Sequence, residues 1–152
     1  MNSKVRWPIA VALLVVSVLM SRAQTQRDVP AAQAHKPTFV TRIYTGPDGQ
    51  SHAEEVEAPF TANGVSKLEV TSGAELHRMS PGGAANWHPG PRRQYVITLS
   101  GTGEIEVAGG KKVPVGPGHI DLIEDTTGQG HITRNFEERV TLWLPIPDQP
   151  GR

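Results

Sequence analysis

The stretch "NWHPGPRRQYVITLSG", residues 86–101, joins a histidine in a proline-glycine bend to a run of strand-forming residues. Because successive side chains of a β-strand point to opposite faces, residues 93–100 predict a strand with two different faces. One face carries Gln94, Val96 and Thr98, and the other carries Tyr95, Ile97 and Leu99. The second face is entirely apolar, so we expect it to be buried in a core or against a second sheet. The mixed first face is typical of a strand that lines a ligand cavity in a β-barrel.

Short runs of the same kind continue on both sides of this strand. They are separated by turns rich in Gly and Pro, of which the sequence contains 16 and 13. Regularly spaced strands with such turns predict an all-β sandwich or barrel. The expected strands lie at residues 38–44, 51–59, 65–70, 74–80, 93–100, 104–108, 111–115, 119–124, 131–135 and 139–146. The length of 152 residues predicts a single domain.

The first 23 residues have the pattern of a secretory signal peptide. A positively charged start precedes an apolar run at residues 7–20, and the small residues Ser21 and Ala23 follow, as expected before a cleavage site. The run is short for a membrane span. We therefore expect cleavage after Ala23 and export to the periplasm or the extracellular space, with no stable membrane span in the mature chain. The alternative is an uncleaved N-terminus that anchors the protein to the membrane.

The remainder divides into a linker and a folded domain. Residues 24–37 are polar, contain Ala and Pro and have no apolar period, which predicts a disordered linker. The folded domain is then residues 38–152. With 15 basic and 15 acidic side chains, the chain has no large positive surface for a nucleic-acid partner. It has no cysteine, so its stability must come from its core, a metal or a partner subunit rather than from disulfides.

Two motifs in the chain resemble those of the cupins, which are small antiparallel β-barrels related to the jelly roll. The first is "GAANWHPGPRRQYVITLSG", residues 83–101. His88 matches the first histidine of the cupin motif, and Gly101 matches its closing glycine. Gly90 stands where the second histidine belongs, and Gln94 stands where the glutamate belongs. The resemblance is therefore stronger for the fold than for the ligand set.

The second motif is "GHIDLIEDTTGQGHITRN", residues 118–135. Gly118 matches the opening glycine, and His131 and Asn135 match the closing histidine and asparagine. Glu124 replaces a proline, and the loop is about two residues longer than in the family. Together the two motifs imply an all-β, antiparallel, jelly-roll-like cupin β-barrel that follows the signal peptide.

The resemblance extends over residues 68–144 and implies a metal site formed by His88, Gln94 and His131. These side chains would converge in the barrel on a divalent transition metal such as Mn, Fe, Ni or Zn. Gln94 offers a neutral carbonyl oxygen in place of a carboxylate, so we expect weak binding, or no cofactor at all. The missing charge could come from a nearby acid of the second motif: Asp121, Glu124 or Asp125.

The candidate substrate-binding residues are Trp87, Arg92 and Asp125, and no catalytic residue can be named. Each has a structural alternative. Trp87 could belong to the barrel core, and of the adjacent Arg92 and Arg93 at most one can face inward. The two motif histidines could likewise be hydrogen-bonded structural residues.

Three functions are compatible with these features. The first is an exported single-domain cupin enzyme that uses a metal to act on a small polar molecule in the barrel, by oxygenation, isomerisation or elimination. The second is a metal-free module that binds a small molecule in a polar cavity without catalysis. The third is a purely structural barrel, which would not need polar side chains to converge. The resemblance also implies that two barrels pair through an outer sheet face as a homodimer.

Overall fold

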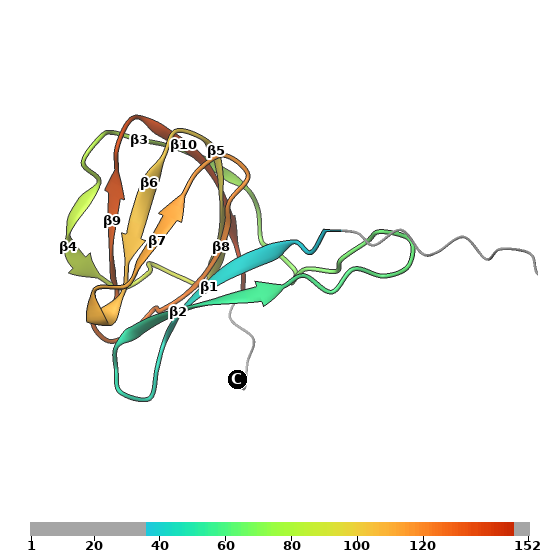
Figure 1. Ribbon diagram of the computed structural model, residues 1–152, viewed down its shortest axis with the longest axis horizontal. Helices are drawn as coiled ribbons and strands as arrows, with labels where there is room; N and C mark the ends of the chain where they lie inside the picture. Colours follow the sequence, from blue (N-terminus) through green and yellow to red (C-terminus); the bar gives the residue numbers. More distant parts are fainter. Residues whose placement is uncertain (1–35, 148–152) are drawn as a thin grey trace, which may run out of the picture. The chain divides into compact units, whose positions relative to one another are not determined.

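The structure, a computed structural model, describes residues 36–147, which form ten strands and one short 3-10 helix (Figure 1). The strands are β1 (Phe39–Thr45), β2 (Ser51–Glu57), β3 (Glu75–Met79), β4 (Ala84–His88), β5 (Gln94–Ser100), β6 (Gly103–Glu106), β7 (Lys112–Val115), β8 (Ile120–Glu124), β9 (His131–Asn135) and β10 (Arg139–Pro145). The 3-10 helix is η1 (Ala108–Gly110). No helix in this part of the chain is long and apolar enough to span a membrane. The predicted signal peptide and all but the end of the predicted linker lie outside the described residues.

The strands form two sheets, which confirms the all-β prediction. One sheet has the order β2-β1-β8-β5-β10-β3 and the other the order β4-β9-β6-β7. All strand pairs are antiparallel except β1 with β8, which is parallel. The expected antiparallel, jelly-roll-like barrel is therefore confirmed in part: the fold is all-β and mostly antiparallel, but the described sheets do not close into a barrel. Among the described strands, β2 and β3 end one sheet and β4 and β7 end the other, so no hydrogen-bond ladder closes the ring.

The main core lies between the two sheets. Its buried side chains come from both of them: Ile43, Val96 and Ile123 from the six-stranded sheet, and Ile105, Val107, Val113 and Val115 from the other sheet and its flanks. Full burial of an aliphatic side chain of this size stabilises a fold by about 1.5–3 kcal/mol. The cluster therefore holds the sheets face to face, and strands β6 and β7 of the small sheet stand opposite the large sheet in Figure 1.

Strand β5 turns its mixed face toward the core, as predicted for a strand that lines a cavity. Gln94, Val96 and Thr98 are all buried. On the opposite face Tyr95 is buried in a second, smaller cluster with Val40 and Ile146, whereas Leu99 is 48% exposed. The expectation that this whole apolar face is buried was thus wrong at Leu99. The reason is that Val40 and Ile146 cover Tyr95 on the outer face of the sheet, whereas Leu99 lies outside this cluster.

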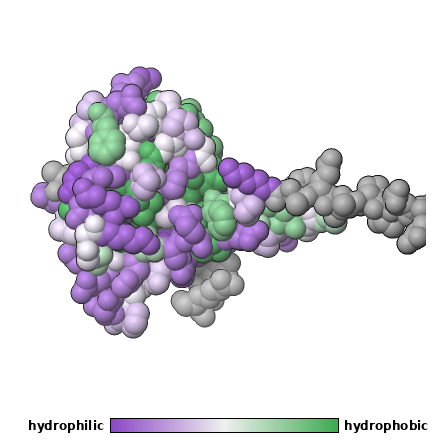
Figure 2. Space-filling model, in the orientation of Figure 1, coloured by the Kyte–Doolittle hydropathy of each residue, from purple (hydrophilic) through white to green (hydrophobic). Residues whose placement is uncertain are grey.

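Two strand predictions also differ from the structure. Residues 65–70 do not form a strand, and β4, which carries His88 at its end, was not expected. Hydrophilic side chains cover most of the face of the domain seen in Figure 2, with apolar side chains visible between them. The exposed apolar residues include Leu76 at 71% and Leu99 on the outer face of the large sheet. Pairing through that face stays a prediction.

Candidate functional site

A cavity of about 150 Å³ lies between the two sheets. Most of the exposed wall surface is apolar, and six apolar residues line the cavity: Met79, Pro91, Val96, Ile105, Ile123 and Trp143. Six polar residues also contribute to the lining: His88, Gln94, Asp121, His131, Thr133 and Arg139. These polar side chains come from five different strands, β4, β5, β8, β9 and β10. An apolar cavity of this volume holds a molecule about as large as benzene, so the site has room for a small molecule only.

The two motif histidines meet where β4 ends and β9 begins. His88 and His131 are register partners in this pair, and their ring centroids lie 4.8 Å apart with an angle of 69° between the planes. Gly130 allows this approach. Its φ is +74°, and a Cβ atom there would overlap the carbonyl group of His88. Only glycine adopts this conformation without strain, so the residue before His131 determines how closely the two imidazoles approach.

Asp125 orients His131 from outside the cavity. The Nδ1 atom of His131 donates to Oδ2 of Asp125 at 2.6 Å, and both side chains are buried. When one ring nitrogen of a histidine donates to a carboxylate, the hydrogen bond fixes the tautomer and the orientation of the ring, and the other nitrogen stays available as an acceptor or ligand. Asp125 is therefore a positioning residue, and Nε2 of His131 is left for the cavity.

Gln94 and Gly90 stand at the two altered positions of the first motif. Gln94 is 1% exposed, and its Oε1 atom accepts a hydrogen bond from Nε of Arg92 at 3.1 Å. A Cβ atom at Gly90 would lie 2.5 Å from Cγ2 of Ile123, so a histidine at that position would fit only if the side chain of Ile123 moved. Within residues 36–147 no three His, Cys, Asp or Glu side chains converge in a way that could hold a metal ion. The described donors for a metal are therefore two imidazoles and one amide.

The other predicted site residues lie outside the cavity. Arg92 is exposed, and besides its bond to Gln94 it forms an ion pair with Glu75 at 2.6 Å. Trp87 is 37% exposed and does not contribute to the wall. Of the six predicted site residues, the structure thus brings together His88, Gln94 and His131. Trp87, Arg92 and Asp125 do not line the cavity.

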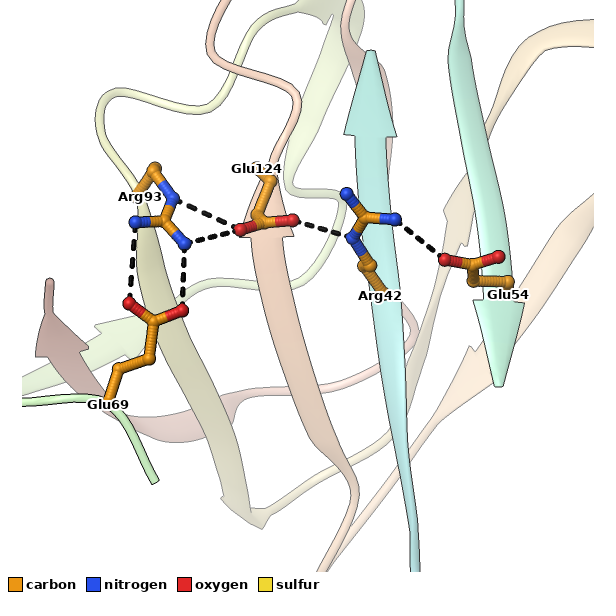
Figure 3. Close-up of polar contacts among 5 residues, drawn as sticks. All are labelled: Arg42, Glu54, Glu69, Arg93 and Glu124. Carbon is orange, nitrogen blue, oxygen red and sulfur yellow. Dashed lines mark hydrogen bonds and ion pairs between the residues drawn. The ribbon is translucent and has the colours of Figure 1, made fainter. Parts of the chain in front are cut away.

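Glu124 and Arg93 belong to an ion-pair network on the outer side of the large sheet (Figure 3). Glu124 accepts hydrogen bonds from Arg93 and, at 2.6 Å, from Nε of Arg42. The network continues from Arg93 to Glu69 at 2.9 Å and from Arg42 to Glu54 at 2.8 Å. Burial raises the pKa of Glu124, but the two arginines outweigh it and hold that pKa below its usual value. Glu124 therefore supplies no charge to the cavity, and Arg93 is already paired.

Two charged residues of the cavity wall were missed as site residues. Arg139 is 2% exposed, and Asp121, which the sequence analysis named only as a nearby acid, is 0% exposed. Burial lowers the pKa of Arg139, and the charge of Asp121 offsets part of this effect. The hydrogen bond between Asp121 and His119 raises the pKa of that histidine. The sequence pattern of β10 could have indicated Arg139. Arg139, Thr141 and Trp143 share one face of this strand, and Val140, Leu142 and Leu144 share the other.

No protein-family model and no curated protein matches the sequence. Among solved structures, an RmlC-like cupin protein from Desulfovibrio desulfuricans is similar in fold, with 13% identity over 76% of this chain and 92% of that chain and a TM-score of 0.36. A protein described as an ethanolamine utilization protein Q from Salmonella typhimurium has 14% identity over 75% of this chain and 98% of that chain, with a TM-score of 0.37. The resemblance to cupins is carried by the two sequence motifs, and the structure adds two facing β-sheets.

Proposed function

We propose that the protein is an exported cupin module that binds a small polar molecule in the cavity between its two sheets. The observation that carries the proposal is the convergence of polar side chains from five strands on one small enclosure. Burying polar groups between sheets costs free energy unless partners compensate them. A purely structural sandwich would be more stable with apolar residues at Gln94, Asp121 and Arg139. The polar wall therefore favours a binding role over a structural one.

The proposal is tested by closing the cavity from one side of β5. Val96 is 6% exposed and lines the cavity, whereas Leu99 lies on the opposite face of the same strand and is 48% exposed. We expect the parent protein to bind molecules of about six heavy atoms from a panel of small polar compounds, detected by saturation-transfer NMR. Val96→Phe should abolish the signals, and the matched control Leu99→Phe should keep them. Equal binding by Val96→Phe and the parent, with both folded by circular dichroism, would refute the proposal.

A second candidate function is metal-assisted chemistry on the bound molecule. The observation that favours it is the hydrogen bond from His131 to Asp125, because metal-ligating histidines are held by a carboxylate in the same way. His88 and His131 would hold the divalent ion with Gln94 as a third donor, and because no carboxylate of the described residues joins this set the ion would be weakly bound. Such an ion would act as a Lewis acid toward an oxygen of the bound molecule. This candidate keeps oxygenation, isomerisation and elimination open as reaction types.

The metal candidate has its own test. Calorimetric titration of the metal-stripped protein with manganese, iron(II), nickel and zinc should show weak binding, because two imidazoles and a neutral amide are the only donors of the proposed site. Gln94→Glu should strengthen binding by adding a negative ligand, and His131→Ala should weaken it. His77→Ala is the control, since His77 stacks on Trp143 and lies outside the pair of motif histidines. Unchanged binding by His131→Ala would exclude the site.

A further inference from the structure

Arg139 carries a buried positive charge that forms no ion pair in the described part of the chain. Its Nε and Nη1 atoms are buried and have no hydrogen-bond partner within residues 36–147. Its Nη2 atom contacts only the Sδ atom of Met79, at 3.8 Å, which is a weak acceptor. A guanidinium stays protonated at neutral pH even when burial lowers its pKa. Removing a charge from water costs free energy unless the charge is paired. An anionic group from a bound ligand would therefore stabilise Arg139.

Asp121 carries the complementary feature on the same cavity wall. Its Oδ1 atom accepts from Nε2 of His119 at 3.0 Å, but its Oδ2 atom is buried without a partner in the described structure. Asp121 and Arg139 do not form an ion pair, since no carboxylate oxygen in residues 36–147 lies within 4.0 Å of the guanidinium. The residues that line the cavity therefore include Arg139, with two donor atoms unpartnered in the described structure, and Asp121, with an unpartnered acceptor atom, and both belong to the six-stranded sheet.

We propose that the cavity binds a small carboxylic acid with a hydrogen-bond donor beside its carboxylate, an α-hydroxy or α-amino acid, whose carboxylate pairs with Arg139 and whose donor pairs with Asp121. A planar carboxylate matches two nitrogens of a guanidinium in a two-pronged hydrogen bond. A hydroxyl or ammonium group on the neighbouring carbon gives Oδ2 of Asp121 its missing donor. The inference rests on the proposed function, because it names the class of molecule that the same cavity takes.

The size and lining of the cavity agree with this class. A volume of about 150 Å³ accommodates roughly six heavy atoms, the number in lactate or alanine. The apolar part of the wall, including Val96, Ile105 and Trp143, would contact the carbon end of such a molecule. A monocarboxylate without a donor would leave Asp121 unpaired, and a neutral amide would leave Arg139 unpaired. Both should therefore bind less tightly than the acid that carries both groups.

Four matched probes of nearly equal size test the inference on the full-length chain. They are lactate, alanine, propionate and lactamide, titrated by calorimetry and by ligand-dependent shifts of the melting temperature. We expect lactate or alanine to bind most tightly, propionate less tightly, and lactamide least tightly. The stronger of lactate and alanine identifies the donor as a hydroxyl or an ammonium group. Binding of lactamide as tight as that of lactate, or no binding of any of the three carboxylates, would overturn the proposal.

Two variants separate the roles of the charged residues. Arg139→Gln should weaken lactate binding by about tenfold to a hundredfold, the usual value of a hydrogen bond to a charged group. Asp121→Asn keeps the acceptor for His119 and should remove the preference for lactate or alanine over propionate while all three still bind. Arg78→Gln is the control, because Arg78 has a side chain that is 73% exposed, on the outer face of the same sheet. Should Arg139→Gln fail to fold, Arg139→Lys keeps the charge without the planar fork and should bind with an intermediate affinity.

The outcomes also distinguish this inference from the proposed function. In one outcome neutral molecules bind in the cavity, Val96→Phe abolishes their binding, and carboxylates bind no more tightly than the neutral molecules. The proposed function would then stand and the inference would fail. A water molecule that joins Arg139 to Asp121 predicts something different: each single variant would lower the melting temperature, and the parent would bind no carboxylate. That result would also overturn the inference.

Discussion

Replacing Gly130 with alanine should separate His88 from His131 and destabilise the domain. The φ of +74° costs a residue with a Cβ atom about 1–2 kcal/mol. The new Cβ would also overlap the backbone of His88, which forces β4 and β9 apart, and overpacking of this kind costs about 1–3 kcal/mol. The sum is about 2–5 kcal/mol, which is a large part of the 5–15 kcal/mol that stabilises an ordinary domain.

The control for this substitution is Gly109→Ala. Gly109 has the same φ of +74°, but nothing lies within 4 Å of its added Cβ, so only the conformational cost of about 1–2 kcal/mol applies. Urea denaturation gives the two free energies of unfolding. We expect Gly130→Ala to lose clearly more stability than Gly109→Ala, and to lose ligand binding as well. Equal losses in the two variants, with ligand binding intact in both, would refute the view that Gly130 determines how closely the histidines approach.

Three further predictions concern other parts of the molecule. The pKa of His119 is raised by its hydrogen bond with Asp121, so its stabilising effect is complete below its unfolded value of 6.5 and is lost as the pH rises through the folded pKa. The difference in unfolding free energy between the parent and His119→Gln should accordingly shrink as the pH rises above 6.5, and a constant difference would contradict this. Glu124→Gln should cost about 2 kcal/mol in urea denaturation because two arginines lose a half-buried acceptor, whereas the exposed Glu54→Gln should cost below about 1 kcal/mol; equal losses would show that burial does not strengthen the network. N-terminal sequencing of the exported protein should find a start directly after Ala23, and recovery of the intact chain in the cytoplasm would contradict export.

The strand pattern and the two motifs of the sequence were sufficient to predict an all-β fold with two histidines at one cavity. Local alternation and turn residues carry that information, because each strand must present one face to the interior. The alternation of β5 also indicated that its mixed face, which carries Gln94, Val96 and Thr98, lines a cavity, and the structure turns these side chains inward. The apolar face was expected to be buried as well, which holds for Tyr95 but not for Leu99. The alternation of a strand does not specify how far other segments cover its outer face.

The charges of the site were harder to predict than its histidines. Arg92 and Arg93 lie within the first motif, and at most one of them was expected to face inward and bind a ligand. Both are instead paired with glutamates from other segments. Arg139 lies outside both motifs, at the start of β10, and reaches the cavity because β10 pairs with β5 and β3. Such long-range pairing depends on the register of the sheet, which the sequence pattern alone does not specify. Asp125 was predicted near the site for the right reason, its position in the second motif, but it acts through His131 rather than at the cavity wall.

The central claim is that a small polar molecule binds between the sheets, and backbone NMR of the protein during titration with the tightest-binding probe tests it most directly. The account predicts that the largest chemical-shift changes fall on the inward-facing residues Gln94, His131 and Arg139, and that Val96→Phe removes them. Changes confined to the outer face around Leu76 and Leu99, or changes in Val96→Phe as large as in the parent, would contradict it.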